Sequence, residues 1–553
     1  MRLKIAVGLI VAGLLAVIGG IGLKTIWAPP ETVSASYSAA GPAPLTVIEP
    51  AVLGLSPERV DIKVQADGEF LLAVGRSEDV KAWVGPAAHT TITGEADGAL
   101  QGTLTDGEAQ APNPSGSDLW VSEETAASGI EYRWADPAPG EWSILLAADG
   151  TKPAPTNVTV SWPNDTSTPG ALVLIIIGAL AAVLGVALAL VSGRRAAPPA
   201  PPAAPRPGGR RAAREPERPA GWVPDQEAGR TRFAAGTVAV LAALALAAGS
   251  VLPAQAAPAA GEAHPVLLPG QLTRIMESVG AAVAAGDSAK DPDKLKDRVT
   301  GAALTMRSAN YRVRAGKGDV QPPVPVSAGP VLTSMISSTS EWPRTAVAVT
   351  KGKSNPVPQV IVLSQANARE NYKMVGAMQM LPGTKFPQVS TEEGGTTAVA
   401  LKDKDGLAYS PNDALALLSG YLTEGKNAKA VAKNTFADQI HAFQKDQQSS
   451  NRNAKITFSR STVADSVRSL RTADGGAVVF GYLHNLMRSL PSEAGARVEL
   501  SPEFAALAGA ESTTKGVDVT YAETVFVKVP PAGSKDKVSL IGVAQDLVAA
   551  KLK

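Results

Sequence analysis

Two long apolar segments flank a short arginine-rich connector, and this arrangement constrains the rest of the chain most strongly. The segments Ala171 to Ser192 and Phe233 to Leu252 are each long enough to cross a bilayer core of roughly 30 Å. The connector, residues 193–232, holds nine arginines against four acidic residues. Because cytoplasmic loops are enriched in Lys and Arg, this bias predicts a cytoplasmic connector. The flanking regions, residues 30–168 and 253–553, are then expected outside the cell.

A third apolar run lies at the N-terminus, within residues 1–29. Arg2 and Lys4 precede an uninterrupted apolar stretch from Ile5 to Leu23, a layout shared by signal peptides and membrane anchors. The stretch is long for a signal peptide and no clear Ala-x-Ala site follows it closely, so we expect an anchor. Its glycines would form a small-residue face suited to packing on another helix, although glycine is also tolerated in membrane helices generally. The sequence thus predicts three transmembrane helices, in residues 1–29, 169–192 and 233–252.

The connector and the segment after it allow further interpretations. Six prolines between residues 198 and 207 favour an extended, stiff tether, whose arginines could contact anionic lipid head groups. Overlapping PxxP patterns could also recruit a cytoplasmic partner. Ala254-Gln255-Ala256 follows the third apolar run in the layout of a signal peptidase site, so cleavage after Ala256 is an alternative to an intact chain.

Charge is divided unevenly along the chain, although the total is only +1. Residues 30–168 hold twenty Asp and Glu against six Lys and Arg, whereas residues 253–553 hold 34 Lys and Arg against 27 Asp and Glu. The two regions expected on one side of the membrane therefore carry opposite net charge. The chain has no cysteine, which excludes disulfides, thiol catalysis and cysteine-based metal sites.

The acidic region, residues 30–168, has the period-two hydrophobicity of β-strands. Residues 60–64 and 70–74 alternate on either side of Asp67-Gly68, which predicts a β-hairpin. Further strands are expected at 80–84, 130–134, 142–146 and 158–162, with a polar loop at 101–118. Such short strands separated by turns predict an all-β sandwich of two sheets. The acidic pair Glu78-Asp79 lacks calcium-loop spacing and is interpreted as exposed turn residues.

The region after a linker at 253–266 mixes helical and strand periods. We expect helices at 272–283 and, opened by Asp291 and Pro292, at 292–306. Strands should follow at 331–337, 346–350, 360–363 and 372–380. The order then recurs, with helices from Asn412 and over 431–443, strands at 454–458, 477–487 and 517–529, and a final helix at 541–552. The sequence predicts two tandem α+β units, each with its own curved sheet, at 267–408 and 409–553.

Two short segments carry a resemblance to a known fold. Arg307-Ser308-Ala309-Asn310-Tyr311 leaves the second expected helix, and Trp342-Pro343-Arg344 enters a central strand. In this respect the region resembles the cone-shaped, ketosteroid-isomerase-like α+β fold, and also uncharacterised membrane-anchored proteins of actinobacteria. The resemblance covers about half the chain and implies architecture, because that fold hosts enzymes and binding modules alike.

An isomerase of this fold would need an acidic base facing a proton donor in an apolar cone. The resemblance makes Asp297 with Tyr311 and Tyr372 the candidates in the first unit, and Asp438 with Tyr482 those in the second. Asp297 falls on the polar side of its helix, so we interpret it as a surface carboxylate. The sequence therefore predicts no catalytic residue in either unit.

Other motifs for chemistry are also lacking in the sequence. The four histidines, His89, His264, His441 and His484, include no pair at the helical spacing of metal ligands. Residues 403–406 have the wrong glycine spacing for a calcium loop, and no phosphate-binding loop, nucleophile elbow or zinc-protease motif occurs. Basic residues are scattered without a stacking motif for nucleic acid. We expect no metal, no cofactor, no nucleic-acid partner and no enzymatic activity.

The function expected from these patterns is that of a non-enzymatic, multi-pass protein of the cell envelope. It would present two extracytoplasmic domains for scaffolding or binding, with the lipid bilayer and another envelope protein as candidate partners. Opposite charge could dock the acidic and basic regions on each other, and the alternative is that each charge serves solubility alone. The alternatives are a module that binds an anionic wall polymer or an apolar ligand, and an envelope lipid or glycan enzyme.

Overall fold

The computed structural model describes residues 2–39, 41–193, 264–316, 320–338, 341–353, 355–389 and 395–553. The chain forms two compact units, one of Met1–Pro30 with Asp165–Ala260 and one of Glu31–Asn164 with Gly261–Lys553. The connector beyond Gly193, the third apolar segment and the expected cleavage site after Ala256 lie outside the described residues.

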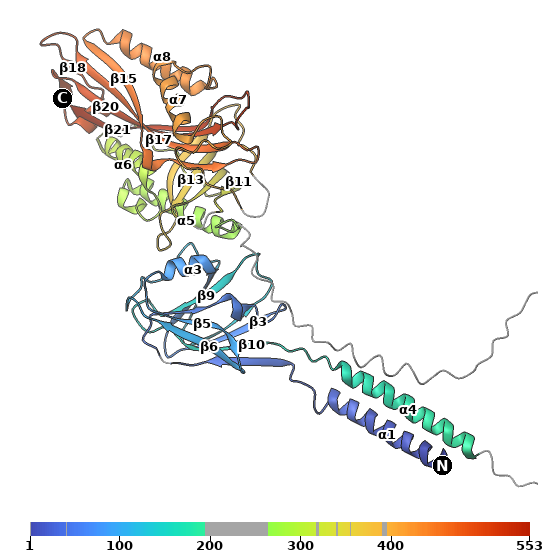
Figure 1. The fold of residues 1–553 in the computed structure, drawn as a ribbon. Coiled ribbons are helices and arrows are strands. Elements are labelled where there is room, and N and C mark those ends of the chain that lie inside the picture. The colour runs from blue at the N-terminus through green and yellow to red at the C-terminus, as the bar shows by residue number, and fades with distance from the viewer. Residues whose placement is uncertain are drawn as a thin grey trace, which may run out of the picture. The chain divides into compact units, whose positions relative to one another are not determined.

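The first unit contains two long helices, α1 (Arg2–Lys24) and α4 (Pro169–Gly193), which pack side by side (Figure 1). Within the described residues these two helices are long and apolar enough to cross a membrane. Small residues recur at intervals of seven along both helices. In α1 they are Ala6, Gly13 and Gly20, and in α4 they are Ala171, Gly178 and Gly185.

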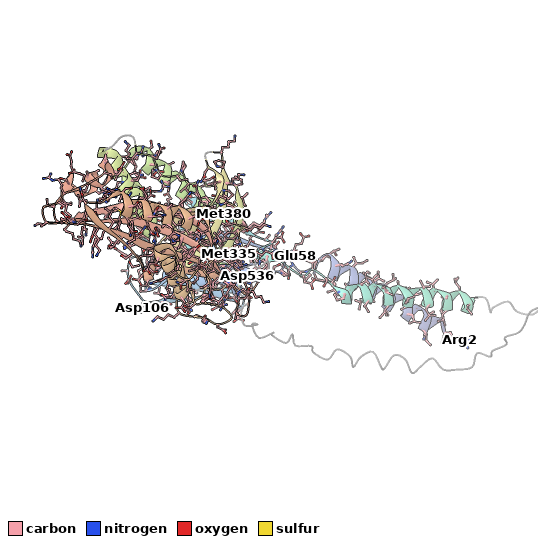
Figure 2. All side chains as sticks on the ribbon, turned by 90° about the horizontal axis from the view of Figure 1, so that it is seen from above. Arg2, Glu58, Asp106, Met335, Met380 and Asp536 are labelled. Atoms are coloured by element: carbon pink, nitrogen blue, oxygen red, sulfur yellow. The ribbon has the colours of Figure 1, made fainter. Side chains whose placement is uncertain are left out.

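The two helices touch through these small residues. A Cβ atom added at Gly13 would lie 2.5 Å from the carbonyl oxygen of Gly178, and one at Gly20 would lie 2.8 Å from that of Ala171. Backbones this close require glycine, the usual solution for helix pairs in lipid. The order of the contacts makes the helices antiparallel, so the N-terminal end of α1 lies beside the C-terminal end of α4. That end carries Arg2, labelled in Figure 2.

The second unit begins with a region of two β-sheets, residues 31–164, called here the β region. The first sheet has the strand order β1 (Thr32–Tyr37), β10 (Asn157–Pro163), β3 (Val60–Gln65), β8 (Gly129–Trp134). The second has the order β6 (Ala99–Thr105), β5 (His89–Ala96), β2 (Leu45–Ile48), β9 (Trp142–Ala147), β4 (Phe70–Arg76), β7 (Ser122–Ala126). Two short helices complete it, α2 (Pro50–Leu53) and α3 (Ser77–Val84).

The expected hairpin at residues 60–74 is wrong, because its two strands belong to different sheets. β3 pairs with β10 and β8, whereas β4 pairs with β9 and β7. The alternating residues Val60, Ile62 and Val64 and their counterparts on β4 nevertheless fill one core between the sheets. The period of two identified the buried faces correctly, but it could not show that the Asp67-Gly68 turn crosses from one sheet to the other.

Two other assignments in the β region also differ. Residues 80–84, expected as a strand, form α3, in which Glu78 and Asp79 occupy the first turn. Carboxylates there are favoured by the helix dipole, and Val80 and Val84 are buried one turn apart. The expected loop at 101–118 includes most of strand β6.

The C-terminal region, residues 264–553, is built on a nine-stranded antiparallel sheet. Its strand order is β11 (Val331–Ile336), β12 (Arg344–Gly352), β13 (Asn355–Gln365), β14 (Lys373–Met380), β21 (Ser539–Leu552), β20 (Val517–Val529), β17 (Ala477–Pro491), β15 (Ala454–Thr462), with β16 (Arg468–Arg471) pairing β17. A separate two-stranded sheet contains β18 (Val498–Glu499) and β19 (Ser512–Thr513).

The two expected α+β units therefore share one sheet instead of forming two. The cause is residues 541–552, which were expected as a helix and are part of strand β21. β21 pairs with β20 along most of its length and also with β14, so it joins the strands of both halves. Leu540, Val543 and Leu547 have helical spacing, but pairing with the neighbouring strand overrides that local pattern.

Helices cover the sheet on both faces. They are α5 (Pro269–Ala289), η1 (Pro292–Leu295), α6 (Gly301–Gly316), α7 (Pro411–Glu424), α8 (Thr435–Ser450), η2 (Ala464–Ser466) and α9 (Pro502–Ala508). Asp291 caps η1 by accepting a hydrogen bond from the Asp293 amide, and the expected second helix is interrupted before α6 begins at Gly301.

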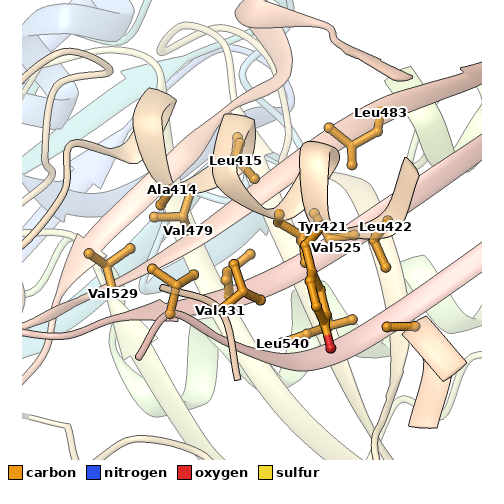
Figure 3. Close-up of a cluster of buried hydrophobic side chains, with 14 of the residues drawn as sticks. Ala414, Leu415, Tyr421, Leu422, Val431, Val479, Leu483, Val525, Val529 and Leu540 are labelled. Carbon is orange, nitrogen blue, oxygen red and sulfur yellow. The ribbon is translucent and has the colours of Figure 1, made fainter. Parts of the chain in front are cut away.

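Several hydrophobic clusters lie against this sheet, and two of them show how it is covered and joined. Under α7, Leu415 and Leu422 pack on Val479, Val525 and other residues of β17, β20 and β21 (Figure 3). A second cluster combines β11–β14 with β16, β17, β20 and β21, and so draws on both halves of the region. Met335 belongs to it and Met380 packs against it; both are labelled in Figure 2.

Candidate interface between the β region and the C-terminal region

A buried ion pair joins the β region to the C-terminal region. Asp79 on α3 lies 2.5 Å from the guanidinium of Arg344 on β12, and the two side chains are 3% and 2% exposed. The Arg344 guanidinium also stacks over the Trp342 ring, with its central carbon 4.1 Å from the ring centroid. The predicted exposed turn at Glu78-Asp79 is thus wrong for Asp79, whose helix turns it inward.

Asp118 forms a second polar centre on the same side of the β region. Its carboxylate accepts hydrogen bonds from the Arg298 guanidinium at 2.6 Å and from the Tyr372 backbone amide at 2.8 Å. Its own backbone amide donates to the side-chain oxygen of Asn371 at 2.9 Å. The Asn371 amide group in turn donates to the carbonyl of Gly116 at 3.1 Å. The Asp118 carboxylate therefore accepts from one charged and one neutral donor, which belong to two separate segments of the C-terminal region.

Backbone carbonyls of the β region also accept hydrogen bonds from arginines of the C-terminal region. Arg369 donates to the carbonyls of Trp83 and Val84 at 2.9 and 2.8 Å. These carbonyls lie at the C-terminus of α3, where a cation is favoured by the helix dipole. Arg274 on α5 donates to the Trp120 carbonyl at 2.6 Å. The interface thus pairs basic side chains of the C-terminal region with both carboxylates and carbonyls.

Apolar contacts surround these polar groups. Trp83 and Trp120 of the β region lie in one core cluster, with ring centroids 5.8 Å apart. Ala368 of the C-terminal region belongs to the same cluster and Trp342 packs against it. Buried tryptophan and arginine side chains are the residues that dominate binding energy at protein interfaces.

Burial sets the electrostatics of both carboxylates. Desolvation raises the pKa of Asp79 above its ordinary value, and the positive charge of Arg344 opposes that rise. Desolvation likewise raises the pKa of Asp118, opposed mainly by Arg298. A buried carboxylate depends on its partner, because removing the partner leaves an uncompensated charge in a low-dielectric surrounding.

The residues considered for isomerase chemistry do not converge. Asp297 is exposed, whereas Tyr372 is buried at the interface and its hydroxyl has no hydrogen-bond partner within the described residues. Burial raises the pKa of Tyr372. Tyr311 donates its hydroxyl to Asp287 at 2.5 Å. No acidic base faces a proton donor among these three residues.

The second candidate pair is also separated. Asp438 is exposed in the first turn of α8, while Tyr482 packs with α6 and its hydroxyl contacts His484 at 2.8 Å. Among the residues with described positions, no group of three His, Asp or Glu side chains could hold a metal ion.

Sequence reasoning missed the side chains that join the two regions. The division of charge predicted attraction between them, but nothing in the sequence singled out Asp79 or Asp118 among twenty acidic residues. Arg344 and Trp342 do belong to the segment that carries the fold resemblance, but there they only marked the start of a central strand. A weak signal existed for α3, whose acidic first turn precedes apolar residues at helical spacing.

Comparison with protein families gives one match. The family described as Domain of unknown function (DUF8094) matches residues 263–552. This chain belongs to that family. The DUF8094 match covers the whole nine-stranded sheet and supports membership of an uncharacterised family. Searches of curated proteins and of solved structures gave no significant match.

Proposed function

We propose that this protein is a non-enzymatic membrane protein of the cell envelope, which presents its β region and its DUF8094 domain as one rigid body for scaffolding or binding. The observation that carries the proposal is the ion pair between Asp79 and Arg344, buried from solvent on both sides. An exposed ion pair contributes little, but a buried pair fixes the position of one element against another. A body of this kind would offer partners a single surface of defined shape.

The membrane arrangement rests on α1 and α4. Both helices are long and apolar enough to cross a bilayer. Their antiparallel packing puts the N-terminal end of α1, with Arg2 and Lys4, beside the C-terminal end of α4. The arginine-rich connector follows α4 directly in the chain. Because Lys and Arg accumulate on the cytoplasmic side, this end is assigned to the cytoplasm and the β region to the exterior. Packing on α4 also favours α1 as a retained anchor over a cleaved signal.

Side-chain contacts also bear on two other interpretations of the C-terminal region, the ketosteroid-isomerase-like fold and the binding of an anionic wall polymer. The segment that resembles the ketosteroid-isomerase-like fold uses Arg307 and Tyr311 to bind Asp287, which favours an architectural role for these residues. An anionic wall polymer would need accessible cations. Arg298, Arg344 and Arg369 are engaged by the β region and are not available to a polymer. Lysines such as Lys296 and Lys426 are exposed, so the polymer stays the second candidate.

The proposal can be tested by cutting the chain between its two extracellular parts. A protease site is inserted after Ala259 in the full-length protein, and protease is added to intact cells. We expect cleavage, with the C-terminal fragment remaining at the membrane through its contacts with the β region. Asp79→Arg should release the fragment, whereas Glu131→Arg, which reverses an exposed charge, should not.

Two results would contradict the proposal. Cleavage only after cell lysis would overturn the assignment of sides. Release of the C-terminal fragment from the unsubstituted protein would show that the two regions are not held together.

A further inference from the structure

The nine-stranded sheet has one short join, between β14 and β21. These strands are paired only at Gln379↔Val543 and Met380↔Gly542, although β21 continues to Leu552 alongside β20. A cavity of about 350 Å³ is lined by the residues of both strands next to this join, and by α6. Its volume is at the lower end of the range of roughly 300 to 1,000 Å³ typical of small-molecule sites. The fork between the two strands is therefore a candidate ligand pocket.

Much of the lining is apolar. The residues concerned come from α6, β14, β21 and α8, and are Ala303, Met306, Met374, Ala377, Phe436 and Val543. Methionine side chains adapt their shape to what packs on them. This wall could hold a compact apolar group.

Several polar residues of the lining are already used inside the protein. Arg307 is bound by the carboxylate of Asp287 and by the Val324 carbonyl. The Gln379 amide group donates to Asn355 at 3.1 Å, and that of Gln545 donates to Glu523 at 2.9 Å. These groups shape the pocket, and their main hydrogen bonds are made elsewhere.

Two buried oxygen atoms of the lining lack partners within the described residues. The Thr524 side chain is buried, with the residue 1% exposed, and its hydroxyl has no hydrogen-bond partner. The side-chain oxygen of Asn310 is likewise buried without a partner, because its amide group donates to Gln321 instead. Asp546, which is partly buried, adds a carboxylate to the same lining. Unpartnered buried acceptors are costly and rare, so a cavity lined by two of them beside a carboxylate suits a hydrogen-bond donor.

The charge of the pocket selects the kind of donor. Burial raises the pKa of Asp546 to about 6, and Arg307 opposes the rise. At neutral pH the carboxylate is therefore mostly ionised. Arg307, the cation that acts on its pKa, is already bound to Asp287. Of the common donor groups, an ammonium offers three N–H bonds and a positive charge.

We propose that this pocket binds a small primary amine with a compact apolar body. The ammonium group would donate to Asp546, Thr524 and Asn310, and the apolar body would pack on Met306 and Met374. All lining residues belong to the C-terminal region, so this inference does not depend on how that region meets the β region.

The test uses three probes of one shape and different charge, added to the purified full-length protein in detergent micelles. They are benzylamine, benzyl alcohol and benzoate, with binding followed by saturation-transfer NMR and titration calorimetry. We expect benzylamine to bind at least tenfold more tightly than benzyl alcohol, and benzoate not to bind. Equal affinities for all three probes, or no binding of benzylamine at millimolar concentration, would overturn the proposal.

Two variants tie the binding to the pocket. Asp546→Asn and Thr524→Val should each weaken benzylamine binding, by at least tenfold for Asp546→Asn. The matched control is Asp297→Asn, which removes an exposed carboxylate of the same region and should leave affinity unchanged. Thermal unfolding shows whether each variant is folded. A folded Asp546→Asn protein with unaltered affinity would refute the assignment.

Discussion

Replacing Asp79 and Arg344, singly and together, tests whether the buried pair holds the two regions in register. Both side chains are almost fully buried and 2.5 Å apart, so either one alone would be an uncompensated charge. Breaking a buried pair by removing one partner costs about 3–5 kcal/mol, whereas replacing both partners by groups of similar volume is close to neutral. We therefore expect Asp79→Asn and Arg344→Met each to destabilise the protein by about 3 kcal/mol or more. The double variant should recover most of that loss.

The assay follows from the residues around the pair. Trp83, Trp120 and Trp342 lie at the interface, so its separation should change tryptophan fluorescence during a urea titration. The control is the same cycle on Lys63 and Glu131, whose side chains are 51% and 76% exposed. Such a pair contributes at most about 1 kcal/mol. The reasoning is refuted if the single Asp79 and Arg344 variants cost less than this control, or if the double variant loses the sum of both.

Three further predictions concern other parts of the molecule. Gly13→Ile should separate α1 from α4, seen as lost helix crosslinking in membranes, whereas Gly8→Ile should not, because no atom lies within 4 Å of an added Cβ there. Asp546→Asn should raise the free energy of unfolding at pH 7 by about 2–3 kcal/mol and leave it unchanged near pH 3. The raised pKa means that the native state holds this proton more tightly, so wild-type stability falls between pH 4 and 6, and an unchanged pH profile would contradict this. Phe526→Ala should cost about 3–5 kcal/mol and loosen both halves of the shared sheet together in hydrogen exchange, where loss of protection in one half alone would oppose a common core.

Local sequence patterns predicted an element correctly where its contacts in the fold favour the same secondary structure. The strand expected at 517–529 is β20 as described, and the small residues of α1 form a packing face. α3 and β21 were missed for opposite reasons. α3 is a short helix whose apolar residues also alternate, and β21 has helical spacing but lies beside an otherwise unpaired edge of β20.

The candidate interface was less predictable than the fold. Net charge predicted the sign of the attraction between the regions, because it sums over many residues. It could not select Asp79, since its partner Arg344 lies far along the chain and only the packing of α3 brings them together. The pocket at the β14 and β21 join was invisible for the same reason: it depends on a strand that local sequence assigns to a helix.

The most direct test of the docked, extracytoplasmic arrangement uses cysteine pairs, because the chain has no cysteine of its own. Ser115 and Glu370 are exposed and flank the hydrogen bond from Asn371 to the Gly116 carbonyl. With Ser115→Cys and Glu370→Cys together, a short membrane-impermeant bismaleimide added to intact cells should link the two regions within one chain. A protein in which the reagent labels each cysteine separately but never joins them would contradict the docking. Labelling of neither residue until the cells are lysed would contradict the assignment of sides.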